Sequence, residues 1–414
     1  MIIDIAIIGA GAAGLSAART AHALGKTCVV LEARQRVGGR AFTDRSLGQP
    51  FDAGAAYIHF SNRNPWMREA RRLGIATQPW RGWTHHVPWL NGQWLSSDDQ
   101  ERRLTGYSEL WDQIETLGEA FTDRSIADAA KHGSPWAQAT ASAMSRLGLG
   151  DEPSRLSLYD YIHQWEGPDH IVPDGYGHLV AASSHGLPIE LGSIVRRITA
   201  RAKGFDVETE RGTVQARAVI VTVSIGVLKA GHIAFEPGLP NALLRALDGL
   251  EMGALTKVAL SFDGERFGLK PGDDQIVLDA PGGAMTFEVW PFNRDLVLAV
   301  TGGDAGRALC HVGEAEAVDM AASLFSSVVG QDCRPHLRGG RLAGWWTDPF
   351  SEGGYAYARP GAYDAREALM DVGIDGLYFA GEADAGGRLG ATMTVAGASM
   401  AGWNAAKRAA RFLG

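Results

Sequence analysis

The feature that most constrains the fold is a glycine-rich turn between an apolar run and an alanine-rich stretch near the start of the chain. Residues 2–8 read Ile-Ile-Asp-Ile-Ala-Ile-Ile, which predicts a buried parallel strand. Gly9, Gly11 and Gly14 follow with the spacing Gly-x-Gly-x-x-Gly, and residues 15–24 then predict a helix. A strand, a tight turn and a helix in this order predict the first unit of a Rossmann-like α/β domain.

Each glycine of this turn has a physical reason for its position. Gly9 permits the tight turn, Gly11 lets the backbone approach a pyrophosphate, and Gly14 permits close helix–strand packing. A second predicted strand, residues 27–31, leads to Glu32, which lies 18 residues after Gly14 and is placed to accept hydrogen bonds from an adenosine ribose. The pattern predicts a dinucleotide site but does not separate NAD from FAD.

A basic segment that contains two glycines follows at residues 34–40, with the sequence Arg-Gln-Arg-Val-Gly-Gly-Arg. Gly38 and Gly39 remove side-chain bulk where a cofactor must pass, and Arg40 offers a forked charge suited to phosphate oxygens. A solvated basic turn would explain the arginines but not the adjacent glycines. We therefore expect this segment to belong to the cofactor site.

Composition limits the remaining possibilities. With 414 residues the chain is longer than one hydrophobic core usually serves, so we expect two domains. A formal charge of −8 argues against a nucleic-acid partner. The three cysteines have no CxxC or histidine spacing typical of a metal site, so we expect no metal and a reduced compartment. We expect no signal peptide and no membrane span, which together predict a cytoplasmic protein.

Two stretches resemble a known family. Residues 32–43, Glu-Ala-Arg-x-Arg-Val-Gly-Gly-Arg-x-x-Thr, and residues 51–55, Phe-Asp-Ala-Gly-Ala, resemble the FAD-binding start of the flavin-containing amine oxidases. That family includes monoamine oxidases, polyamine oxidases and lysine-specific histone demethylases. Residues 57–59, Tyr-Ile-His, with Asn64 and Pro65 after them, are most similar to the polyamine oxidase branch. The resemblance implies an α/β fold: a Rossmann-like, glutathione-reductase-type FAD-binding domain with a second, α+β substrate domain.

The resemblance also implies how the chain is divided. The FAD-binding domain is expected from residues 1–78, 170–250 and 360–414, and the substrate domain from residues 79–169 and 251–359. The first substrate piece looks helical, and the second alternates apolar and polar residues as in an antiparallel sheet.

The helical piece is rich in aromatic residues that either wall a substrate funnel or anchor a small helical core. The tryptophans are Trp80, Trp83, Trp89, Trp94, Trp111, Trp136 and Trp165. His85 and His86 are expected in a loop, because sequence neighbours do not normally share a metal.

The C-terminal region contains a short strand and a long helix. Residues 376–382, Gly-Leu-Tyr-Phe-Ala-Gly-Glu, predict a strand whose end places Glu382 at the cofactor hydroxyls. Residues 392–412 predict a helix, and the resemblance places its N-terminus against the flavin pyrimidine ring, with Thr394 and Val395 at the contact. A positive helix end stabilises the negative charge of reduced flavin there. An ordinary docking helix would explain its small residues but not the preceding Gly-Glu turn.

Residues 344–357 contain Trp-x-x-Asp-Pro-x-x-x-Gly-x-Tyr-x-Tyr, which resembles a segment of polyamine oxidases and histone demethylases. The resemblance places Trp345 near the flavin ring and Tyr355 in the wall of the substrate space. An aromatic wall desolvates an amine and favours its neutral form. The alternative is a tyrosine pair that serves only to pack a strand.

Lys257 lies in a predicted strand, where a lysine is usually solvated. Its surroundings are similar to the family segment whose lysine holds a water against flavin N5, so the resemblance implies a functional ammonium. His59 occupies the place where polyamine oxidases carry a glutamate or histidine, although Phe60 replaces the usual glycine. The expected catalytic residues are thus Lys257, Tyr355, Trp345 and His59.

Further expectations come from the resemblance alone. Gly354 corresponds to the cysteine that binds flavin covalently in monoamine oxidases, which predicts non-covalent FAD. Thr394 corresponds to the second tyrosine of the aromatic pair, which predicts a wider pocket on that side. The expected cofactor-binding residues are Gly9, Gly11, Ala12, Ala13, Gly14, Glu32, Ala33, Arg34, Gly39, Arg40, Gly54, Ala55, Ala56, Tyr57, Val195, Thr222, Trp345, Gly381, Glu382, Thr394, Val395 and Ala398.

The resemblance implies a FAD-dependent oxidase acting on a small-molecule amine. Hydride passes from the carbon next to the neutral nitrogen to flavin N5, the imine hydrolyses, and dioxygen becomes hydrogen peroxide. A flavin desaturase of the protoporphyrinogen oxidase or carotenoid type shares the N-terminal signals. A third possibility is a binding protein that has lost its cofactor, as in the prenyl-protein dissociation inhibitors. The amine and the oligomeric state stay open.

Overall fold

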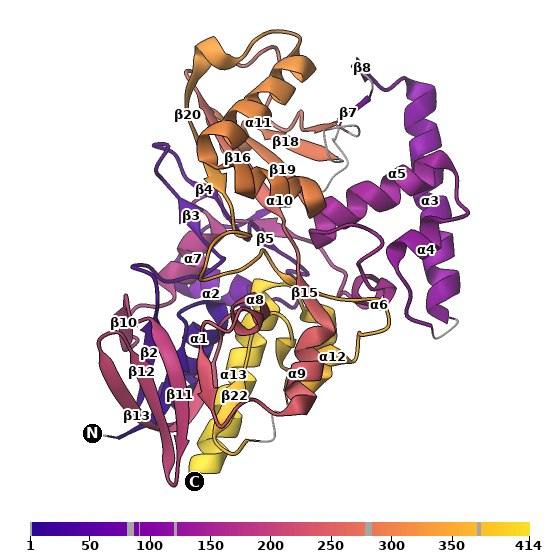
Figure 1. Ribbon diagram of the computed structural model, residues 1–414. Coiled ribbons are helices and arrows are strands. Elements are labelled where there is room, and N and C mark those ends of the chain that lie inside the picture. Colours follow the sequence, from indigo (N-terminus) through magenta and orange to yellow (C-terminus); the bar gives the residue numbers. More distant parts are fainter. Residues whose placement is uncertain (1, 81–86, 91, 120–121, 278–283, 371–373) are drawn as a thin grey trace.

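The computed structural model describes residues 2–80, 87–90, 92–119, 122–277, 284–370 and 374–414. Two large sheets organise them, one of eight strands around the N-terminal strand and one of seven strands in the upper part of Figure 1. Trp83, His85 and His86 lie outside the described residues, so the expectations for them are not addressed by the structure.

The eight-stranded sheet confirms the Rossmann-like unit. Its strands are β1 (Ile3–Ile8), β2 (Cys28–Glu32), β10 (Ile189–Leu191), β11 (Val195–Arg201), β12 (Gly204–Thr209), β13 (Gly212–Val221), β14 (Ala234–Glu236) and β22 (Leu377–Phe379). The order is β10-β2-β1-β13-β12-β11-β14, and β22 pairs with β13. Because β1 runs parallel to β2, the chain must cross over between them, and α1 (Ala12–Ala23) makes that crossover.

The C-terminal helix α13 (Val395–Leu413) packs against α1, so the tail of the chain lies beside its beginning (Figure 1). A Cβ atom on Gly402 would lie 1.9 Å from the carbonyl oxygen of Ala13, so only glycine permits this approach. The helix starts three residues later than predicted, because Met393 has a left-handed φ of 62° and Thr394 caps the first turn. The small residues along α13 therefore allow the backbones of α13 and α1 to approach closely.

The seven-stranded sheet has the order β20-β16-β19-β18-β17-β7-β8. Its strands are β7 (Val87–Leu90), β8 (Gln93–Trp94), β16 (Thr256–Phe262), β17 (Gln275–Val277), β18 (Met285–Val289), β19 (Leu296–Thr301) and β20 (Leu337–Ala343). The antiparallel sheet expected after residue 253 is confirmed for β16 to β20. The helices α10 (Gly303–Val312) and α11 (Glu314–Val329) interrupt the strands and were not predicted.

The two faces of this sheet differ. One face buries apolar residues such as Val258, Leu260 and Val297 against Ala321 and Phe325 of α11. Alternation along each strand sends the residues in between to the opposite face. That opposite face borders the cavity described below.

The expected helical piece consists of α3 (Ser97–Glu119), α4 (Ile126–Ala130), α5 (Pro135–Met144) and α6 (Leu158–Ile162). It has its own core, in which Leu110 and Ile114 of α3 are fully buried beside Leu158. Trp111 packs against this core, which supports the anchoring role for that tryptophan.

Short elements connect these layers. The strands are β3 (Thr43–Asp44), β4 (Phe51–Asp52), β5 (Tyr57–Ile58), β6 (Gln78–Pro79), β9 (His170–Ile171), β15 (Leu250–Met252) and β21 (Ala356–Ala358). The helices are α2 (Pro65–Leu73), α7 (Tyr176–Ala182), α8 (Ile225–Lys229), α9 (Asn241–Asp248) and α12 (Ala365–Ala368).

Candidate functional site

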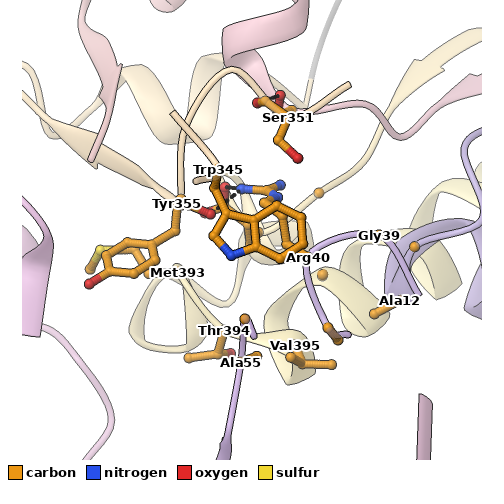
Figure 2. A pocket seen from close by; sticks show the side chains of 18 of the residues that line it. Ala12, Gly39, Arg40, Ala55, Trp345, Ser351, Tyr355, Met393, Thr394 and Val395 are labelled. Carbon is orange, nitrogen blue, oxygen red and sulfur yellow. Dashed lines mark hydrogen bonds and ion pairs between the residues drawn. The ribbon is translucent and has the colours of Figure 1, made fainter. Parts of the chain in front are cut away.

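A cavity of about 840 Å³ extends between the two sheets and collects the predicted site residues. All of the predicted catalytic and cofactor-binding residues except Gly14 line it. Figure 2 shows Trp345 and Tyr355 on one side, with Ala55, Thr394 and Val395 opposite them. Gly14 acts in packing instead, because a Cβ atom there would lie 1.9 Å from the carbonyl oxygen of Gly9.

One end of the cavity is built by the glycine-rich turn. The first helical turn of α1 has no side-chain cap, so its backbone N–H groups are left for a ligand. A Cβ atom on Gly11 would meet no described atom within 4 Å, since it would enter the cavity. Glu32 is buried and fixed in place, its carboxylate accepting hydrogen bonds from the backbone N–H groups of Ala10 at 2.7 Å and Arg34 at 2.8 Å. This end suits an anionic group joined to a ribose.

Ser193 is a cavity residue that the sequence did not reveal. Its hydroxyl is buried, and within the described part of the chain it has no hydrogen-bond partner. Its backbone N–H donates to the carbonyl of Glu32 at 2.8 Å, which places it at the same end. A buried, unsatisfied hydroxyl is uncommon and fits a polar ligand. A lone serine between two strands carries no motif that would have pointed to it.

The two arginines of the predicted cofactor segment are already engaged. Arg34 forms a bidentate pair with Asp348, with N–O distances of 2.8 and 2.7 Å. Arg40 Nη1 donates to the carbonyl of Gly354 and to Glu382 Oε1, both at 2.9 Å. Each arginine therefore ties the N-terminal segment to the segment that contains Trp345. The expected charge for phosphate is present at the cavity, but part of it is neutralised by protein carboxylates.

Thr394 and Val395 stand at the start of α13, as expected. Thr394 Oγ1 accepts from the backbone N–H of Gly397 at 3.0 Å and donates to the carbonyl of Ala391 at 2.7 Å. Its hydroxyl thus serves the helix cap, and the positive end of α13 lies at the cavity. Met393, which the sequence did not reveal, also lines the cavity in its left-handed conformation.

The aromatic residues of residues 344–357 are held by their polar atoms. Trp345 Nε1 donates to the carbonyl of Ala53 at 2.9 Å, and the Tyr355 hydroxyl donates to the carbonyl of Gly148 at 2.8 Å. Burial raises the pKa of Tyr355 well above its usual value, so the phenol stays neutral. With these atoms satisfied, both side chains present aromatic surface to the cavity.

Lys257 is buried on β16, with 9% of its surface exposed, so the solvated alternative is wrong. Its Nζ donates to the carbonyls of Asp52 at 3.0 Å and Gly54 at 2.7 Å. Burial lowers the pKa of Lys257, while the carboxylates of Asp52 and Glu288 oppose that shift. Two carbonyls therefore hold the amino group at the cavity beside Gly54.

His59 lies at a more open part of the cavity, with 44% of its side chain exposed. Its Nδ1 lies 3.0 Å from Asp169 Oδ2, and the ring centroid of Tyr57 lies 5.8 Å from that of His59 and 4.7 Å from that of Trp80. Trp80 therefore lines the cavity. This agrees with the first of the two roles expected for the tryptophans, that of forming the wall of a substrate funnel.

Thr222 and Val195 line the cavity from the eight-stranded sheet. Thr222 Oγ1 donates to the carbonyl of Ile8 at 2.7 Å, so its hydroxyl supports the glycine-rich turn.

The described residues contain no group of three or more histidine, cysteine, aspartate or glutamate side chains able to hold a metal. They also include no helix with both the length and the apolar character that crossing a membrane requires.

Comparisons with known proteins agree with this geometry. A family model described as flavin containing amine oxidoreductase matches residues 81–410, and one described as an NAD(P)-binding Rossmann-like domain matches residues 7–72. The chain is 28% identical to Polyamine oxidase 4 of Oryza sativa subsp. japonica, over 92% of this chain and 83% of that protein. It is 27% identical to Polyamine oxidase 2 of Arabidopsis thaliana over the same shares. It is 24% identical to Lysine-specific histone demethylase 2 of Homo sapiens, over 99% of this chain and 53% of that protein.

Proposed function

Because the chain belongs to the flavin containing amine oxidoreductase family, we propose that it oxidises the carbon next to the nitrogen of a small-molecule amine. FAD is its cofactor. The cavity suits that group: the N–H groups of the uncapped first turn of α1 would bind its phosphates, and Glu32 with the unsatisfied hydroxyl of Ser193 would bind its ribose. The cavity lining within the described residues includes no cysteine, so we propose that FAD binds without a covalent bond.

FAD supplies the acceptor for a hydride and passes two electrons to dioxygen. The protein prepares the amine for this transfer. Trp345 and Tyr355 exclude water from the reacting carbon, and their apolar surface favours the neutral amine, whose lone pair assists hydride loss. The amine, dioxygen and water become an aldehyde, hydrogen peroxide, and ammonia or a shorter amine.

The observation that carries the proposal is the placement of Lys257. Two carbonyls, those of Asp52 and Gly54, hold its amino group at the cavity, and one N–H is left over. A fixed ammonium there orients a water or stabilises negative charge that develops on dioxygen. The expected two-domain division, with residues 1–78, 170–250 and 360–414 around FAD, belongs to the same proposal.

The test is anaerobic bleaching of the purified yellow protein with a panel of monoamines, diamines and amino acids, followed by peroxide measurement on re-aeration. Bleaching by an amine and stoichiometric peroxide support the proposal. A yellow protein that no amine bleaches would point to the desaturase alternative, and a protein that stays colourless after reconstitution would point to a binding protein. Either result refutes the proposal.

A further inference from the structure

Glu288 is a charged residue on the cavity face of the seven-stranded sheet. Lys257 of β16 pairs with Val300 of β19, and on β18 Glu288 pairs with Leu298. Paired residues share a face of an antiparallel sheet, as do residues two apart on one strand. Lys257, Val300 and Glu288 therefore point to the same side, and all three line the cavity.

Glu288 differs from the other carboxylates of the cavity in having no partner. Glu32, Asp169 and Glu382 each accept hydrogen bonds from protein donors, and Glu166 is exposed to solvent. No hydrogen bond or ion pair reaches the carboxylate of Glu288 from the described residues. Lys257, on the same face of the sheet, donates two of its N–H groups to the carbonyls of Asp52 and Gly54 instead. The carboxylate of Glu288 is only half-buried and lines the cavity, so it is available to accept a hydrogen bond from a ligand there.

The charged groups around Glu288 make this part of the cavity attractive to a cation. Asp274, which accepts from the backbone N–H of Val289, and Asp52 both add negative potential, while Lys257 opposes it. Burial together with Asp274 raises the pKa of Glu288 to about 7. Burial raises the pKa of Tyr57, which also lines the cavity, and the negative charge of Glu288 adds to that rise.

The distance along the sheet suits a substrate with two nitrogens. One strand separates β16 from β18, and Glu288 is offset by two residues from the position in line with Lys257. Strand spacing and rise per residue then place the two Cα atoms roughly 12 Å apart. With both side chains reaching into the cavity, a few methylene groups span the gap between the reacting carbon and a second nitrogen at Glu288.

We propose that Glu288 is a specificity-determining residue that binds a second, cationic nitrogen of the substrate, so that the cavity favours diamines over monoamines of the same length. The inference rests on the proposed amine oxidation. The ion pair fixes the far end of the carbon chain and leaves the neutral nitrogen between Trp345 and Tyr355. A monoamine has no second nitrogen to pair with the carboxylate, and its apolar carbon chain would instead displace water from that charged group.

The test compares diaminobutane with butylamine in anaerobic stopped-flow reduction of the holoenzyme, which separates the apparent Kd from the limiting rate. In wild type we expect tighter apparent binding of the diamine. In Glu288→Gln we expect the apparent Kd for the diamine to rise about 10- to 100-fold, with little change for butylamine and similar limiting rates. Glu288→Asp should retain part of the preference. Glu316→Gln, at an exposed carboxylate of α11 outside the cavity lining, should keep all of it.

Two results overturn the inference alone: bleaching by amines with an unchanged diamine preference in Glu288→Gln, or an equal loss for both amines. The FAD content and melting temperature of each variant are measured as well, because a loss of either would show that the substitution acts on the structure and not on substrate binding. If no amine bleaches the wild-type flavin, the proposed function falls and this inference falls with it.

Discussion

Arg40 Nη1 lies 2.9 Å from Glu382 Oε1, and this ion pair joins two segments that are 342 residues apart in the sequence. Glu382 also accepts from the backbone N–H of Ala356 at 3.1 Å, and Arg40 donates to the carbonyl of Gly354 at 2.9 Å. The start of the chain, the segment with Tyr355 and the strand before α13 therefore meet at one partly buried pair. All three segments line the cavity, so this ion pair helps to hold the cavity wall together.

Replacement of Glu382 by glutamine should weaken FAD binding about tenfold, equivalent to ~1.4 kcal/mol, because Arg40 loses its charged partner at the cavity. Equilibrium dialysis or flavin fluorescence measures the change. Arg334→Gln, which removes an exposed pair with Asp319, is the control and should leave FAD binding unaltered. Equal FAD affinity in wild type and Glu382→Gln would contradict the role assigned to the pair.

Gly11 and Gly14 should respond differently to alanine, although both belong to one motif. At Gly11 the backbone φ is −76°, which any residue adopts, and the added Cβ meets only cavity space. Gly11→Ala should fold with a near-normal apoprotein melting temperature and bind FAD at least tenfold more weakly. At Gly14 the Cβ would lie 1.9 Å from the carbonyl oxygen of Gly9, so Gly14→Ala should lose about 1–3 kcal/mol of stability even without FAD. Calorimetry of both apoproteins separates the two effects.

Replacement of Lys257 by methionine should retain FAD and slow turnover or flavin reoxidation by at least about tenfold, because a neutral side chain neither orients water nor stabilises charge on dioxygen. Stopped-flow reduction and reoxidation, measured separately, locate the slow step. Lys203→Met, at an exposed turn, is the matched control. Near-normal kinetics of both half-reactions in Lys257→Met would remove the lysine from the site.

Stability should depend on pH through Glu288. Its pKa is raised from 4.5 to about 7 in the folded protein, so the folded state holds a proton that the unfolded state releases. The resulting destabilisation is absent below pH 4.5, grows up to about pH 7 and is constant above it. Glu288→Gln should therefore have a free energy of unfolding about 1–2 kcal/mol higher than wild type at pH 8, seen as a higher melting temperature, and the gain should vanish in acid. A gain of the same size at both pH values would contradict this assignment.

The cofactor end of the site was predictable because its determinants are local. A tight turn, a close backbone approach and a helix N-terminus each require particular residues at adjacent positions, and Gly9, Gly11 and Glu32 satisfy those requirements within one short segment. The resemblance extended the prediction to Lys257 and Tyr355, and the cavity brings both to the same space.

The substrate end was less predictable because it depends on distant pairing. Whether Glu288 faces solvent or the cavity is decided by its register with β19, which no local pattern specifies. Ser193 is buried because its backbone pairs with that of Glu32, a contact between distant parts of the sequence. Helices α10 and α11 lie in a stretch whose alternation of apolar and polar residues predicted only strands. The sequence placed Arg34 and Arg40 at the cavity. Their carboxylate partners, Asp348 and Glu382, could not be predicted, because each lies more than 300 positions away in the sequence.

The close contact of α13 with α1 means that the cavity is completed only when two segments far apart in the sequence have docked. Without the docking of α13 on Ala13 through Gly402, the cavity lacks the part of its wall formed by Val395 and Ala398. A folding chain in which α13 has not yet docked is therefore expected to leave bound flavin open to water on that side. If flavin binds near Trp345 as we propose, its fluorescence, which is bright in water and quenched by a neighbouring indole, should fall when α13 docks on α1.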